Sequence, residues 1–157
     1  MSTKLTKKKN TAVMWLVKNQ FYQKNETYFI NNLRILDYLR DHNANYDFKG
    51  TAGYTPLMIS VLGKDHRTFF RLLLEGAQYD HKNDAGETAL HLSIKYETHW
   101  MISVVLRYGA ENDDIKDNNG HTPFMLATFR ENKEIMDFYI RRGGLVLTWW
   151  IIRTGPC

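Results

Sequence analysis

Apolar residues recur at three- and four-residue intervals along most of this chain, in short stretches that polar turns separate. Residues 28–40 form the clearest early stretch, and its apolar positions are Tyr28, Phe29, Leu33, Leu36 and Leu39, with Ile30 and Ile35 beside them. This spacing places apolar side chains on one face of an amphipathic helix. A shorter apolar run at residues 12–17 predicts a preceding helix, which Asn10 or Thr11 can cap.

Three later stretches each predict a pair of helices joined by a brief polar connection. The first helix of each pair begins at Thr55-Pro56, Thr88-Ala89 or Thr122-Pro123, where threonine can cap the helix and proline fits its first turn. The connections are Gly63–Asp65, Glu97–Thr98 and Glu131–Asn132. The second helices are expected to bury Phe69, Leu72 and Leu73, then Ile102, Val105 and Leu106, and finally Met136, Tyr139 and Ile140. The pattern therefore predicts an all-α protein.

Two markers in the sequence repeat in step with each other. The first comprises the segments Gly53–Ser60, Gly86–Ser93 and Gly120–Ala127, whose glycines are 33 and then 34 positions apart. The second comprises Asn43-Ala44, Gly76-Ala77, Gly109-Ala110 and Gly143-Gly144, at steps of 33, 33 and 34. Such a period indicates stacked structural repeats, in which neighbours bury the apolar faces that one unit cannot bury alone.

The period and the Thr-Pro-Leu-like start of these segments resemble the ankyrin-repeat family, over about residues 31–144. The resemblance implies an all-α ankyrin-repeat solenoid of about four helix-turn-helix units, with β-turn fingers and a concave face. We expect a disordered basic leader at 1–10, a degenerate N-terminal capping repeat at 11–49, repeats at 50–85 and 86–119, a truncated final repeat at 120–144, and an apolar C-terminal tail at 145–157.

The chain departs from the family pattern at three kinds of position. The histidine that ties adjacent repeats through its ring is kept only as His91, because Met58 and Met125 replace it elsewhere. The glycine usual between the two helices is replaced by Lys64, Glu97 and Glu131. The aspartate usual in the finger is kept only as Asp117, and the other two fingers have Gly50 and Asn83 at this position. Each lost hydrogen bond between units is worth about 1 kcal/mol, so modest stability is expected.

The resemblance also implies where a partner would bind, since ankyrin proteins usually use their finger tips and the exposed side of their inner helices. The corresponding residues are Thr51, Tyr54, Leu62, Asp84, Glu87, Lys95, Tyr96, Asn118, His121, Phe129 and Arg130, with Ala52, Gly63, Ala85 and Asn119 among them. Large aromatic residues and arginine often dominate interface energies, and Tyr54, Tyr96 and Phe129 are large aromatic residues of this surface. Lys95 and Arg130 lie beside two of them, so the surface favours binding to a protein with an acidic or mixed-charge segment. Tyr96 can alternatively cover the neighbouring outer helix.

Charge and cysteine content limit the partners and the cellular location that the sequence predicts. The formal net charge is +4, and Lys4, Lys7, Lys8 and Lys9 lie in the first nine residues, so the rest of the chain is nearly neutral. This argues against direct binding of nucleic acid. The one cysteine, Cys157, allows no intrachain disulfide, which favours a reducing, cytoplasmic location, with the nucleus as an alternative. No apolar run is long enough to span a bilayer, so membrane association is not expected.

The chemistry-bearing residues form no catalytic or metal-binding pattern. The six histidines show no HExxH spacing, and the sequence contains neither a Gly-rich phosphate loop nor a G-x-S-x-G elbow. We therefore predict no enzyme activity, no cofactor and no metal.

The leading hypothesis is a monomeric intracellular protein–protein interaction module that acts as a scaffold or inhibitor. One alternative, by resemblance, is an IκB-like inhibitor of a Rel/NF-kappaB-type transcription factor. Another is an adaptor tethered to a membrane or complex through the tail, where Trp149-Trp150 stands in the apolar run 145–152. This tail can instead cover the apolar edge of the last repeat, or be the altered end of a longer repeat protein.

Overall fold

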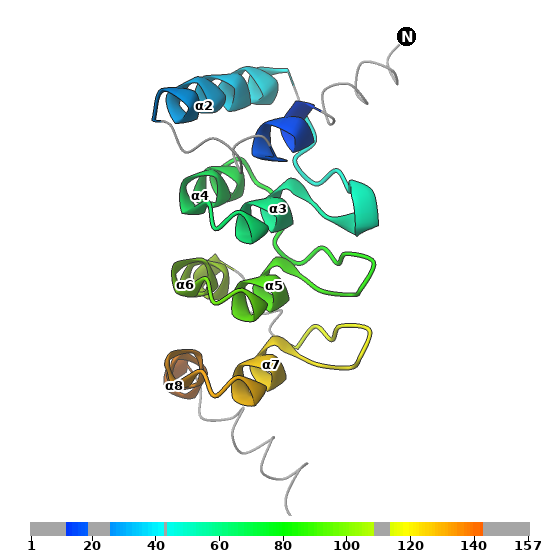
Figure 1. Cartoon of the computed structure of the whole chain (residues 1–157), viewed down its shortest axis with the longest axis vertical. Coiled ribbons are helices and arrows are strands. Elements are labelled where there is room, and N and C mark those ends of the chain that lie inside the picture. The colour runs from blue at the N-terminus through cyan, green and yellow to red at the C-terminus, as the bar shows by residue number, and fades with distance from the viewer. Residues whose placement is uncertain (1–11, 19–25, 43, 109–113, 143–157) are drawn as a thin grey trace, which may run out of the picture.

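Helical hairpins stacked side by side make up the molecule, as Figure 1 shows. The computed structural model describes residues 12–18, 26–42, 44–108 and 114–142. Within these ranges the chain forms helices and turns and no β-strand. A short helical segment at 12–18 precedes α2 (Glu26–Asp41), and three hairpins follow: α3 (Pro56–Leu62) with α4 (His66–Leu74), α5 (Ala89–Lys95) with α6 (His99–Tyr108), and α7 (Pro123–Phe129) with α8 (Lys133–Arg142).

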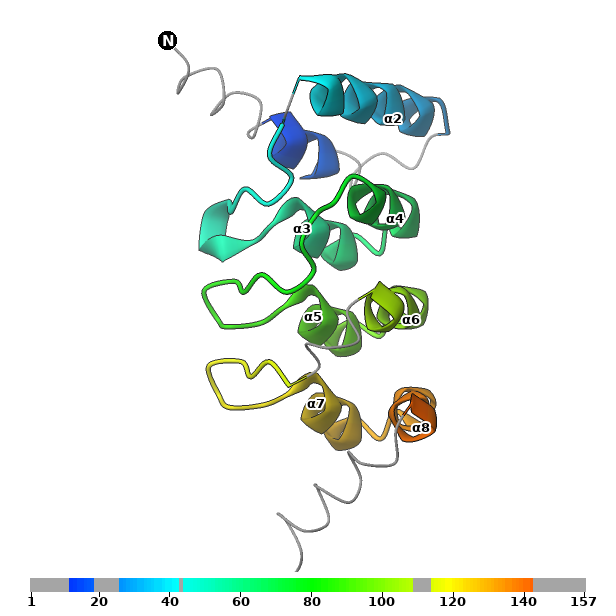
Figure 2. The same ribbon diagram turned by 180° about the vertical axis from the view of Figure 1, so that it is seen from behind.

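The helices form two columns that both views of the molecule show. The inner helices α3, α5 and α7 lie above one another, and the outer helices α4, α6 and α8 form the second column (Figures 1 and 2). Contacts join α3 to α5, α5 to α7 and α4 to α6. The predicted all-α solenoid of helix-turn-helix units is therefore confirmed.

Each inner helix begins where the threonine pattern predicts. The Oγ1 atoms of Thr55, Thr88 and Thr122 accept hydrogen bonds from the backbone N–H three residues later, at 3.3, 3.5 and 3.2 Å. These bonds satisfy a donor that has no partner inside the helix, and they fix where the helix starts.

The last hairpin differs from the other two at the core. Leu73 of α4 and Leu106 of α6 are 6% and 1% exposed, whereas Ile140, the matching residue of α8, is 41% exposed. Met136 is only partly buried, and Ile135 packs in the core with Tyr139. The expectation that Met136 and Ile140 are core residues was therefore wrong for Ile140 and only partly correct for Met136. The position is buried where a further hairpin follows, and no hairpin follows α8 within the described residues.

The first unit is joined to the second by a group of charged side chains. Arg71 of α4 bonds to Asp37 of α2 and, at 2.7 Å, to Glu75, and Arg40 of α2 lies 3.5 Å from the same Glu75 carboxylate. Close by, the hydroxyl of Tyr46 donates to the carbonyl of Leu36 at 3.0 Å. Burial, together with the charge of Glu75, raises the pKa of Tyr46 to about 12. Helix α2 is thus bonded to the first of the three hairpins.

Two other sequence-based predictions lie outside the described residues. These are the disordered leader at 1–10 and the apolar tail at 145–157.

Candidate protein-binding surface

Three fingers project from one side of the stack, next to the inner helices (Figures 1 and 2). Each finger is closed by one backbone bond, from the N–H of Gly50, Asn83 or Asp117 to the carbonyl four residues later, at 2.8, 2.9 and 2.9 Å. In the second and third fingers a side chain adds to this closure. Asn83 and Asp117 each accept two backbone N–H groups through Oδ1, at 2.8–3.0 Å.

The finger that keeps the family's aspartate gains an ionised carboxylate. Burial alone would raise the pKa of Asp117, but the backbone N–H groups of His121 and Asn119 outweigh it, so the pKa lies below the usual value. The first finger has Gly50 at this position and no such side chain. It turns instead through the 3₁₀ helix η1 (Thr51–Gly53), in which Ala52 adopts a φ of 56°.

The fingers are bonded to one another in a ladder. The N–H of Asp84 donates to the carbonyl of Ala52 at 3.1 Å, and the N–H of Asn118 donates to that of Ala85 at 3.0 Å. Lysine side chains repeat the link, because Lys49 Nζ donates to the carbonyl of Lys82, and Lys82 Nζ donates to that of Lys116, both at 2.8 Å. These lysines were not predicted from the sequence, although their spacing of 33 and 34 matches the repeat.

The inner helices carry the exposed part of the predicted surface at their carboxyl ends. Because α3, α5 and α7 stack in register, residues 62, 95 and 129 occupy equivalent positions, and so do residues 63, 96 and 130. We call the larger side chains of this row the inner-helix stripe: Leu62, Lys95, Tyr96, Phe129 and Arg130. Tyr96 is 38% exposed and Phe129 is 70% exposed. The Phe129 ring also lies edge-on to His121, with centroids 5.5 Å apart, so the stripe and the third finger meet.

Both cations of the stripe are held by carboxylates. Lys95 Nζ lies 2.9 Å from Glu87, which sits at the base of the second finger and also accepts a bond from Asn83 Nδ2 at 3.0 Å. The bond to Glu87 raises the pKa of Lys95. Arg130 Nη1 lies 3.7 Å from Glu97. These pairs orient the two positive side chains beside Tyr96 and Phe129.

The structure divides the predicted partner-binding residues into three groups. Glu87 is buried and bonded within the protein, and Tyr54 is partly buried against the core, so both contribute to the scaffold. Asp84 and Asn118 are exposed and also link neighbouring fingers. Surface positions on the fingers or inner helices are occupied by Thr51, Leu62, Lys95, Tyr96, His121, Phe129 and Arg130, of which Leu62 and His121 are only partly exposed.

Stacked helix-turn-helix units with bonded fingers define a repeat solenoid, a class of protein that presents an extended surface built from equivalent positions. The sequence profile for ankyrin repeats, in three copies, matches residues 57–143, which is more than half of the 157 residues. The protein therefore belongs to the ankyrin-repeat family, whose repeats are in general protein–protein interaction modules. A comparison with curated proteins finds no significant match. An IκB-like role stays a prediction from the sequence.

Within the ranges that the structure describes, no group of three or more His, Cys, Asp or Glu side chains is arranged to hold a metal ion. None of the helices in those same ranges is both long enough and apolar enough to span a lipid bilayer.

Proposed function

We propose that this protein binds a partner protein through the inner-helix stripe and the adjoining finger tips, and that it acts as a scaffold or inhibitor by occupying that partner rather than by catalysis. The observation that carries the proposal is the exposure of Tyr96 and Phe129 beside the oriented cations Lys95 and Arg130. Aromatic residues and arginine are enriched among the residues that dominate interface energies.

The preformed surface favours binding. Because the fingers and inner helices are already bonded to one another, little conformational entropy is lost when a partner docks. Two ion pairs next to two exposed aromatic rings fit a partner segment that combines apolar side chains with side chains of both charges.

The test replaces Tyr96, Phe129 and Arg130 together by alanine in the full chain. Immobilised wild-type and variant proteins are incubated with native lysate, and captured proteins are identified by mass spectrometry. A captured partner is then produced and its Kd is measured by calorimetry. Truncation of interface hot spots costs about 2 kcal/mol or more each, so the triple variant should bind at least a hundredfold more weakly.

A matched control replaces two exposed aromatic residues of the outer side, Tyr38 in α2 and Tyr108 in α6. This variant should keep the wild-type affinity, and circular dichroism should show both variants folded. A folded triple variant with wild-type affinity would refute the proposal.

A further inference from the structure

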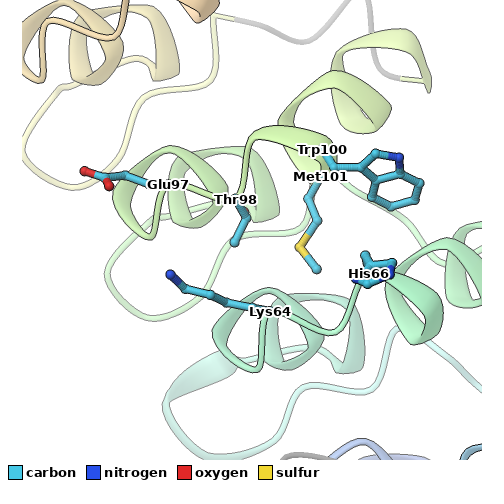
Figure 3. A pocket seen from close by; sticks show the side chains of 6 residues that line it. All are labelled: Lys64, His66, Glu97, Thr98, Trp100 and Met101. Atoms are coloured by element: carbon cyan, nitrogen blue, oxygen red, sulfur yellow. The ribbon is translucent and has the colours of Figure 1, made fainter. Parts of the chain in front are cut away.

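A pocket of about 290 Å³ opens between the turns of the second and third units, outside the inner-helix stripe. Its lining comes from the α3–α4 turn and the start of α4 on one side, and from the α5–α6 turn and the start of α6 on the other (Figure 3). The six residues are Lys64, His66, Glu97, Thr98, Trp100 and Met101.

The interior of the pocket is aromatic and apolar. Trp100 is 48% exposed and lies edge-on to both His66 and Phe70, with ring centroids 5.8 and 6.0 Å apart. It therefore bridges α4 and α6. Met101 is buried, and its thioether points from α6 towards the α3–α4 turn (Figure 3). An indole beside a thioether makes a polarisable surface that adapts to apolar groups of different shape.

Two residues at the rim adopt a backbone conformation that favours glycine. Lys64 has a φ of 52° and Glu97 a φ of 56°. The left-handed conformation costs roughly 1–2 kcal/mol for a residue with a Cβ, and glycine avoids this cost. Glu131 of the last hairpin, which does not line the pocket, adopts the same conformation, so this geometry is shared by all three hairpin turns. The charged side chains of Lys64 and Glu97 extend to the same side of the pocket (Figure 3).

The rim carries one cation, Lys64, and one anion, Glu97, which differ in their ion pairing. The carboxylate of Glu97 lies 3.7 Å from Arg130, which compensates part of its charge. Lys64 forms no ion pair with a carboxylate among the residues that the structure describes. An acidic group on a ligand would therefore meet the Lys64 ammonium at the mouth of the pocket.

We propose that this pocket binds one large apolar side chain of a partner peptide, and that an acidic residue next to that side chain pairs with Lys64. The volume supports this occupant, because pockets for whole small-molecule ligands begin at about 300 Å³, whereas a single anchoring side chain needs less. The six lining residues lie outside the inner-helix stripe, and the two sites are linked by the ion pair of Glu97 with Arg130. Substitutions of Lys64 and Trp100 therefore test the pocket without replacing a residue of the stripe.

The test is an NMR titration of the isotope-labelled full chain with three synthetic peptides. One has a leucine between acidic residues, Asp-Glu-Leu-Glu-Asp. The second reverses the charges, Lys-Arg-Leu-Arg-Lys, and the third removes the apolar side chain, Asp-Glu-Ser-Glu-Asp. The acidic leucine peptide should shift the amide signals of Thr98 and Met101 and the indole N–H signal of Trp100. Its affinity should be at least tenfold higher than that of either other peptide.

Two glycine substitutions then separate binding from folding. Lys64→Gly removes the rim charge and relieves the left-handed backbone, so the protein should stay folded while the acidic leucine peptide binds at least fivefold more weakly. Glu131→Gly makes the equivalent change in the last hairpin, where φ is 51°, and Glu131 does not line the pocket, so binding should be unchanged. Trp100→Ala should weaken binding of the leucine peptides.

Three results would overturn the proposal. The first is the absence of shifts at these signals with the acidic leucine peptide. The second is equal binding of the serine peptide, or no effect of Lys64→Gly. The third is a change of the same signals with protein concentration alone, which would assign the pocket to contact with a second copy of this chain.

Discussion

The imidazole of His91 joins α5 to the third finger, because its Nε2 atom lies 3.1 Å from the backbone carbonyl of His121. The other ring nitrogen, Nδ1, lies 3.2 Å from the backbone N–H of Thr88. A backbone N–H can only donate, so Nδ1 accepts and the proton of the neutral ring is on Nε2, where it is donated to His121. The prediction that His91 ties adjacent repeats is confirmed, and its tautomer follows from its two partners.

This buried ring should make stability depend on pH. Burial lowers the pKa of His91, and the hydrogen bond to His121 and the nearby carboxylates Asp117 and Glu87 oppose this only in part. The unfolded chain therefore takes up a proton near a pH of about 6.5, where the folded ring still resists it. The stabilisation is present above this pH and is lost as the pH falls below it towards the folded pKa. Urea unfolding between pH 7.5 and pH 5 should show a decreasing free energy of unfolding.

His91→Gln provides the control for this effect. The variant should be less stable than wild type at pH 7.5 by about 1–2 kcal/mol, because the bond to the third finger is lost or weakened. Its stability should fall less between pH 7.5 and pH 5 than that of wild type. An equal fall in both proteins would show that other groups cause the pH dependence.

Two glycines of the fingers differ in what a side chain would meet. Gly86 and Gly120 have similar φ angles, 76° and 82°. A Cβ at Gly86 would lie 2.7 Å from the backbone nitrogen of Asn118, whereas a Cβ at Gly120 would have no atom within 4 Å. Gly120→Ala should therefore cost only the left-handed strain, roughly 1–2 kcal/mol. Gly86→Ala should cost more, because the finger ladder must also shift, and thermal unfolding of the two variants measures the difference.

The turn of the last hairpin offers a stabilising substitution. Glu131 adopts a φ of 51°, and the left-handed conformation costs roughly 1–2 kcal/mol for a side-chain-bearing residue. Glycine removes this cost but loses roughly 0.5–1 kcal/mol through its more flexible unfolded state. Glu131→Gly should therefore raise the free energy of unfolding by about 0.5–1 kcal/mol, measured in urea. A lower stability would show that Glu131 makes a compensating interaction.

The middle helix and the last helix of the outer column should tolerate side-chain truncation differently. Leu106 is fully buried between hairpins, so Leu106→Ala should cost about 2–5 kcal/mol through lost burial and the cavity that remains. Ile140 is 41% exposed, so its truncation removes less buried apolar area. Ile140→Ala should therefore lower the free energy of unfolding by less than about 1.5 kcal/mol. Comparable losses in the two variants would mean that Ile140 is covered in solution.

Much of the fold could be predicted because its signals are local. The threonine caps, the apolar spacing of each helix and the repeated glycines depend on residues a few positions apart, so they can be recognised without knowing what packs against what. The inner-helix stripe could be located for the same reason, since equivalent positions of a repeat lie in one row once the period is known.

Other features depend on neighbours in space and could not be predicted with the same means. Glu87 looked like a surface residue, yet it is buried because Lys95 and Asn83 bind its carboxylate. Ile140 fits the apolar pattern of its helix, yet it is 41% exposed, because no further hairpin packs against α8 in the part of the chain that the structure describes.

The amino-acid sequence by itself determined that this protein is a stack of helical hairpins, because a 33-residue period and helix caps are properties of the chain alone. Only the tertiary structure decided which charged side chains are paired, which apolar side chains remain exposed, and that Trp100 and Lys64 meet at one pocket. The physical reason is that burial and electrostatic pairing depend on distances between separate repeats, which exist only after the hairpins have packed.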